Sequence, residues 1–125
     1  MRTAIVTGAN GFVGNAVAKE LSQAGTRVYA IVRENEAVTK GLEDDANITL
    51  IHCDLAEYEE LPQRLQISEA DTFYHFAWEG TAGQKRADYS CQLNNVKAAC
   101  IAVEAAKKLE CTHFVNAGTI DLTER

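Results

Sequence analysis

The sequence predicts an α/β fold in which helices cover both faces of a doubly wound parallel sheet. Short apolar runs alternate with segments of helical periodicity along the 125 residues. The runs are almost continuously apolar, as strands buried on both faces are. Because crossovers between parallel strands are right-handed, the simplest strand order is 3-2-1-4-5, in three layers of helix, sheet and helix.

The first part of the chain predicts two strands around a helix. Thr3–Thr7 (TAIVT) and Arg27–Val32 (RVYAIV) are the strands. Between them, Gly11–Ala24 carries apolar residues at helical spacing, and Gly25 is a typical residue at the end of a helix. Asn35–Leu42 is a weaker, polar helix candidate.

The alternation continues to the end of the chain. The predicted strands are Ile48–His52 (ITLIH), Thr72–Phe76 (TFYHF) and His113–Ala117 (HFVNA). Glu57–Leu65 predicts a short helix that contains the only proline, and Tyr89–Lys108 predicts a long helix. One face of the long helix carries larger apolar side chains, at Leu93, Val96, Cys100 and Val103.

Composition and charge exclude several classes of protein. With 46% hydrophobic and 24% charged residues, the chain is typical of one globular domain, residues 1–125. A net charge of −6 argues against nucleic-acid binding, which needs a basic surface. No apolar run approaches the ~20 residues of a membrane span, and no signal-peptide pattern opens the chain. We therefore expect a cytoplasmic protein that binds neither nucleic acids nor membranes.

The cysteines and histidines predict structural roles rather than a metal site. None of the cysteines belongs to a C-x-x-C pair or has the spacing of zinc ligands. Each lies in or beside an apolar run, as small buried side chains do, and the histidines all fall within predicted strands. These residues are Cys53, Cys91, Cys100, Cys111, His52, His75 and His113.

Three glycines follow the first strand in the stretch TGANGFVG, Thr7–Gly14. Gly8 permits a tight turn, and Gly11 lets an anion approach the first helical turn, where unpaired N–H groups and the helix dipole attract it. Gly14 lets the helix pack closely on the strands. Within a βαβ unit this pattern predicts a Rossmann-type site for a dinucleotide pyrophosphate. The alternative is a glycine-rich turn required only for packing.

The residue after the second strand distinguishes nicotinamide cofactors. An acid there would bind the ribose 2′-hydroxyl of NAD, but this chain has Arg33, whose guanidinium suits the 2′-phosphate of NADP. We therefore expect NADP or NAD, with NADP favoured. Two readings stay open: Glu34 or Glu36 turns inward and favours NAD, or Arg33 is a solvated surface charge.

With these residues in place, the chain resembles the extended short-chain dehydrogenase/reductase family, in its NAD-dependent epimerase/dehydratase branch. TGANGFVG resembles its cofactor loop, CDL (Cys53–Leu55) its adenine-contacting pair after strand three, YHFAW (Tyr74–Trp78) its segment after strand four, and NNVKAA (Asn94–Ala99) the opening of its long helix. The resemblance implies cofactor contacts at Thr7, Gly8, Asn10, Gly11, Phe12, Val13, Gly14, Arg33, Asp54, Leu55, Phe76, Ala77, Trp78 and Asn95.

The chain departs from the family in its acid/base residues. FVNAGT (Phe114–Thr119) resembles the family's strand five, so Thr119 falls where a Ser or Thr helps to hold the substrate oxygen. No tyrosine has a lysine four positions later, so the Tyr-x-x-x-Lys pair that supplies the proton is absent. We therefore expect the N-terminal cofactor half of a longer enzyme, inactive alone.

The resemblance also implies partners for the parent enzyme. It implies an epimerase, dehydratase or reductase that moves a hydride between a substrate carbon and nicotinamide, with a small molecule such as a nucleotide sugar as substrate. An unpaired edge at Phe114–Ala117 and an uncovered apolar face on Tyr89–Lys108 predict homo-oligomers. The alternative, favoured by the missing pair, is a non-catalytic dinucleotide-binding or redox-sensing module.

Overall fold

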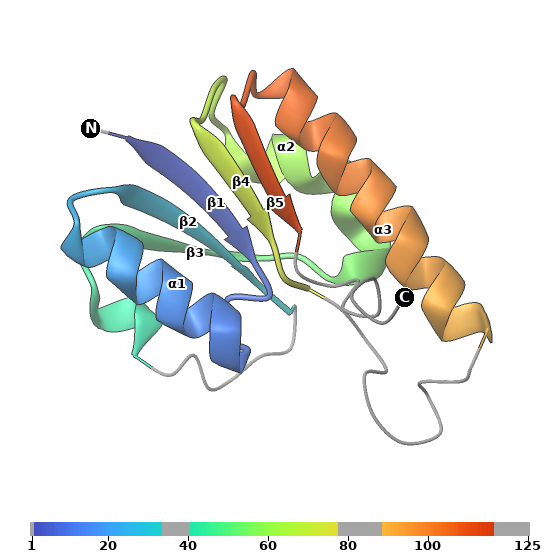
Figure 1. The fold of residues 1–125 in the computed structure, drawn as a ribbon, viewed down its shortest axis with the longest axis horizontal. Helices are drawn as coiled ribbons and strands as arrows, with labels where there is room; N and C mark the ends of the chain where they lie inside the picture. Colours follow the sequence, from blue (N-terminus) through green and yellow to red (C-terminus); the bar gives the residue numbers. More distant parts are fainter. Residues whose placement is uncertain (1, 34–40, 78–88, 117–125) are drawn as a thin grey trace, which may run out of the picture.

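The sheet has the predicted topology. The computed structural model describes residues 2–33, 41–77 and 89–116. Its five strands are all parallel and lie in the order β3-β2-β1-β4-β5, which confirms the prediction (Figure 1). The strands are β1 (Thr3–Thr7), β2 (Arg27–Val32), β3 (Ile48–His52), β4 (Thr72–His75) and β5 (His113–Asn116).

Helices lie on both faces of the sheet. On one side is α1 (Phe12–Gln23), and on the other are α2 (Leu61–Leu65) and α3 (Tyr89–Lys108) (Figure 1). Two short 3₁₀ helices, η1 (Leu42–Asp44) and η2 (Leu55–Glu60), complete the described elements. None of the helices within the described ranges has the length and apolar composition that crossing a membrane requires.

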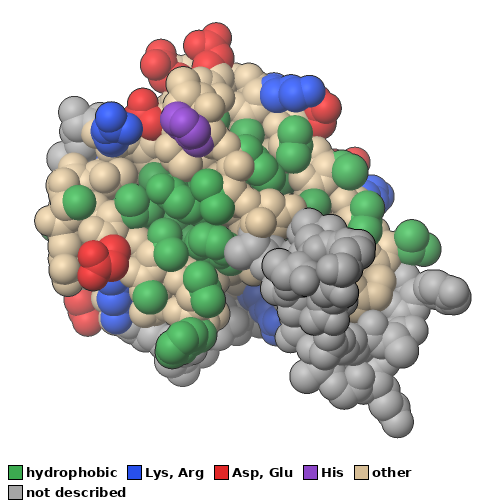
Figure 2. Space-filling model, in the orientation of Figure 1, with side chains coloured by type: hydrophobic (Ala, Val, Ile, Leu, Met, Phe, Trp, Pro, Cys, Tyr) green, Lys and Arg blue, Asp and Glu red, His purple; other side chains and the backbone are tan. Residues whose placement is uncertain are grey.

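The sheet separates two hydrophobic cores because neighbouring side chains of a strand point to opposite faces. Ile5 of β1 packs with Phe73 and with the side chains of α2 and α3, whereas the next residue, Val6, packs with Ala18 of α1. All four residues are fully buried. On the side of the molecule in Figure 2, hydrophobic side chains spread across the middle and charged ones lie mostly toward the margin.

One predicted helix requires correction, and another lies mostly outside the described residues. The segment predicted as Glu57–Leu65 is two helices, because Pro62 cannot continue a helix from the preceding turn and is instead accommodated in the first turn of α2. Of the weak candidate Asn35–Leu42, residues 35–40 lie outside the described ranges, and Leu42 opens the 3₁₀ turn η1.

The long helix has the predicted bounds, but its larger apolar residues are not those that meet the sheet. Leu93 and Val96 are 66% and 54% exposed. Small side chains form the buried face instead, because they let the helix approach closely. They are Ala98, Ala102, Ala105 and Ala106, followed after the helix by Leu109.

Candidate functional site

The turn from β1 into α1 depends on two glycines that touch neighbouring backbone. Gly8 has a positive φ of 65°, and a Cβ there would lie 2.7 Å from the amide nitrogen of Ala77, after β4. A Cβ on Gly14 would overlap the carbonyl oxygen of Gly8. Gly14 therefore packs the helix onto its own preceding turn, which refines the expected packing on the strands. Both glycines hold the turn against the carboxyl ends of β1 and β4.

Gly11 has a different role from the other two glycines. It is exposed, its φ of −79° suits any residue, and a Cβ there would meet only the Gly8 carbonyl oxygen, at 3.3 Å. It is the N-cap of α1, but no side chain caps the helix and no acidic residue lies in its first turn. Backbone N–H groups and the positive end of the helix dipole therefore face an open approach, as anion binding requires.

Side chains around this helix start complete the surface of the loop. Phe12 is 90% exposed and Val13 52% exposed, which is unusual for large apolar residues and leaves an apolar margin beside the polar helix end. Asn10 is half-buried. Asn15, which the sequence did not single out, has a buried amide nitrogen with no hydrogen-bond partner among the described residues.

Thr7 joins the carboxyl ends of β1 and β4. Its hydroxyl accepts hydrogen bonds from the backbone N–H groups of Phe76 (3.0 Å) and Ala77 (3.2 Å) and lies 2.8 Å from His75 Nδ1. Thr7 and His75 are both fully buried, and burial lowers the pKa of His75 to about 4. His75 is thus a neutral structural residue, whereas Phe76 and Ala77 are half-buried at the strand end.

Two further candidates follow the neighbouring strands. Arg33 directly follows β2 and is exposed, and Asp54 occupies the N-cap position of η2 just after β3. The N–H of Cys53 bonds the carbonyl oxygen of Val32 at 2.8 Å, so the two strand ends stay together. The glycine turn, Arg33 and Asp54 therefore occupy the carboxyl ends of adjacent strands, where ligands bind in open α/β sheets (Figure 1).

Of the remaining predicted residues, two belong to the described part of the chain and the others lie outside it. Leu55 is half-buried at the start of η2. Asn95 is fully buried on α3, where its side-chain amide lies 3.3 Å from Gln92 Oε1. Trp78, Thr119, Glu34 and Glu36 lie outside the described residues. Within the described ranges, no three His, Cys, Asp or Glu side chains are grouped as metal ligands would be.

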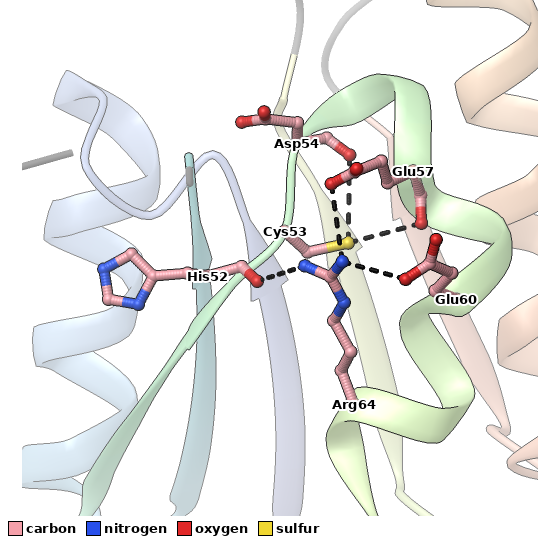
Figure 3. A network of polar contacts seen from close by, with 6 residues as sticks. All are labelled: His52, Cys53, Asp54, Glu57, Glu60 and Arg64. Atoms are coloured by element: carbon pink, nitrogen blue, oxygen red, sulfur yellow. Dashed lines mark hydrogen bonds and ion pairs between the residues drawn. The ribbon is translucent and has the colours of Figure 1, made fainter. Parts of the chain in front are cut away.

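Sequence reasoning missed the polar network of Arg64, whose partners lie on either side of Asp54 in the sequence. Figure 3 shows Arg64 of α2 reaching the backbone of His52, at the end of β3, and two glutamates of η2. Only the alternation of strands and helices pointed to this region, because the partners of an arginine cannot be read from apolar periodicity.

A comparison with protein families matches residues 4–123 to the model of the NAD dependent epimerase/dehydratase family. A 2-alkyl-3-oxoalkanoate reductase of Shewanella oneidensis is 31% identical over 120 residues, 96% of this chain and 29% of that protein. A dTDP-6-deoxy-L-talose 4-dehydrogenase (NAD(+)) of Aggregatibacter actinomycetemcomitans is 34% identical over 92 residues, 74% of this chain and 32% of that protein. The chain thus spans less than a third of each curated relative.

Solved structures show the same fold. The Bordetella bronchiseptica enzyme WbmH, in complex with NAD+, aligns with a TM-score of 0.76 at 24% identity over 91% of this chain and 38% of that chain. A short chain dehydrogenase from Burkholderia cenocepacia, in complex with NADP, aligns with a TM-score of 0.72 at 22% identity over 86% of this chain and 50% of that one.

Proposed function

Because the chain belongs to the NAD dependent epimerase/dehydratase family, we propose that residues 1–125 form the cofactor-binding part of an NAD(P)-dependent oxidoreductase or epimerase. The observation that carries this proposal is the uncapped start of α1 at Gly11. It lies at the carboxyl ends of the parallel strands, as do Arg33 and Asp54. A dinucleotide needs an anion site flanked by groups that bind its ribose and its base, and these three positions offer that combination.

Each position has a distinct task in this proposal. The N–H groups at the start of α1 hold the pyrophosphate, with Gly11 leaving room for it and Phe12 and Val13 shielding it from water. Arg33 pairs with a 2′-phosphate, so the chain prefers NADP to NAD. Asp54 and Leu55 hold the adenine. Phe76, Ala77 and Trp78 continue the site toward the nicotinamide, which carries the hydride when bound.

The reaction is proposed at a coarser level than the cofactor. Both curated relatives are named for oxidation or reduction between a carbonyl and a hydroxyl compound, one of them a dTDP-sugar. We propose a nucleotide sugar or a similar hydroxy-carbonyl compound as substrate. Thr119 would help to hold its oxygen and Asn95 would support the centre. The 125 residues contain no Tyr-x-x-x-Lys pair, and we propose that a group outside them supplies the proton.

Calorimetry tests the cofactor proposal directly. The chain is titrated with NAD+, with NADP+ and with an uncharged sugar as control; saturable binding of at least one dinucleotide is expected, with NADP+ the tighter. The same preparation, mixed with a panel of nucleotide sugars, should not reduce the cofactor, because a positioned proton donor typically contributes roughly 10²–10⁴-fold. Absence of dinucleotide binding contradicts the proposal, and rapid turnover contradicts the need for a proton donor outside these residues.

A further inference from the structure

Arg64 holds two segments of the chain together beside the end of β3. Its Nη1 donates a hydrogen bond of 2.6 Å to the carbonyl oxygen of His52, and its Nη2 lies 2.8 Å from Glu60 Oε1 and 3.4 Å from Glu57 Oε1 (Figure 3). The Arg64 side chain is only 26% exposed. The planar guanidinium therefore bonds in several directions at once, from a position shielded from most of the solvent.

Between these anchor points lies the turn that carries Asp54. The Cys53 thiol is buried and lies 3.4 Å from the carbonyl oxygen of Glu57, and the N–H of Glu57 bonds the carbonyl oxygen of Asp54 at 2.9 Å. Arg64 fixes the residue before this turn through His52 and the helix after it through the glutamates. The path of the backbone from 53 to 55 is thereby fixed at both ends.

The packing of α2 does not account for this arginine. Leu61 and Leu65 already anchor the helix, with 0% and 3% exposure. Glu57 and Glu60 have side chains that are 42% and 54% exposed, and ion pairs of that kind contribute little to stability. Neither helix packing nor the ion pairs account for the short bond from Arg64 to the carbonyl oxygen of His52. This bond constrains the path of the backbone at the end of β3.

We infer that Arg64 is a positioning residue for the adenine end of the cofactor, an inference that rests on the proposed function. It does not touch the ligand. It sets the orientation of the Asp54–Leu55 backbone, so that the base is met by a preformed turn rather than one that must be ordered on binding. Replacing it should weaken binding of any ligand that carries adenine and should leave the phosphate site at α1 unaffected.

The test compares ligands as well as variants. The variants are Arg64→Met, Arg64→Lys and Glu60→Gln. The matched control is Glu59→Gln, which changes a neighbouring exposed acid. AMP, NAD+ and NADP+ are titrated by calorimetry and inorganic pyrophosphate by NMR. In Arg64→Met, the three adenine ligands should bind about tenfold more weakly, with pyrophosphate unchanged. Arg64→Lys should lose less, because an ammonium still reaches one acceptor. Glu59→Gln should match the wild type.

Hydrogen exchange provides the second measurement. The amides of residues 54–58 should exchange faster in Arg64→Met, and those of β1 should not. Unchanged AMP affinity in Arg64→Met, or an equal loss for pyrophosphate that indicates general loosening, overturns the inference alone. A wild-type chain that binds neither AMP nor either dinucleotide overturns the proposed function and this inference with it.

Discussion

Thr7 and His75 are register partners at the carboxyl ends of β1 and β4, and 2.8 Å separates Thr7 Oγ1 from His75 Nδ1. The Thr7 hydroxyl already accepts two backbone N–H groups, from Phe76 and Ala77. Its own proton is therefore donated to His75 Nδ1, which must be unprotonated. The imidazole proton then resides on Nε2, which is buried and has no hydrogen-bond partner among the described residues.

This arrangement predicts that the chain loses stability in mild acid. The pKa of His75 is about 4 in the folded protein, against 6.5 for an ordinary histidine, because burial disfavours the imidazolium. Between these values the unfolded chain binds a proton that the folded chain does not. The free energy of unfolding linked to His75 therefore has its full value above pH 6.5, and it falls by about 3 kcal/mol as the pH drops to 4.

Urea unfolding at pH 7 and pH 4.5 measures this effect. His52→Gln, which removes an exposed imidazole, should lose as much stability between the two pH values as the wild type. His75→Gln should lose clearly less. If the pH dependence of unfolding is the same with and without His75, the assignment of the neutral buried imidazole is wrong.

The glycines of the first turn should separate binding from folding. Gly11→Val is compatible with the backbone, so its free energy of unfolding should stay within about 1 kcal/mol of the wild type, while dinucleotide binding weakens by ~2–3 kcal/mol. Gly14→Ala places a Cβ into the Gly8 carbonyl oxygen and should destabilise the fold by roughly 1–3 kcal/mol. Denaturant unfolding and calorimetry check both, and wild-type affinity in Gly11→Val would exclude a phosphate site there.

Arg33 should determine the choice of cofactor. Arg33→Asp removes the cation that suits a 2′-phosphate and supplies an acceptor for a 2′-hydroxyl. The ratio of NADP to NAD affinity should therefore fall by about tenfold or more, roughly 1.4 kcal/mol. Arg27→Asp is the matched control, since it makes the same charge change at the amino end of the same strand. An unchanged ratio in Arg33→Asp would mean that Arg33 is only a solvated charge.

The sequence predicted the strands and their order, which depend on buried apolar side chains. It did not predict the individual polar contacts. The apolar runs located every described strand, and the rule of right-handed crossovers supplied their order. The Thr7–His75 bond joins residues 68 positions apart, and the Arg64 bond to His52 joins residues of different elements. Periodicity indicates which side chains are buried, but it carries no information on which donor meets which acceptor.

The faces of α3 show a second reason why part of the structure could not be predicted from the sequence. Large apolar residues at helical spacing define a stripe with Leu93 and Val96, but it is the alanine face that packs into the core between α3 and the sheet. The pattern of large apolar residues therefore identified an exposed stripe of α3 and not its buried face. The expectation that this face lacks cover agrees with its exposure in the folded chain.

That exposure leads to the last prediction, that the chain self-associates through α3. Leu93 and Val96 are three residues apart on the helix, so they lie on one face, and Val115 of β5, at the last strand of the described sheet, is 40% exposed. Exposed apolar stripes and unpaired strand edges both favour contact with a second copy. Light scattering should detect dimers or larger species at tens of micromolar, where interfaces of about 7 kcal/mol become populated.

Charge substitutions locate the interface. Leu93→Lys combined with Val96→Lys should give monomers, because association would then bury like charges that have no arranged partners. Val13→Lys replaces a comparably exposed apolar residue at the start of α1 and should leave the association intact. A wild-type chain that is a monodisperse monomer under these conditions contradicts the prediction. Dimers that survive the double substitution would instead assign the contact to the edge of β5, which Val115→Lys would then test.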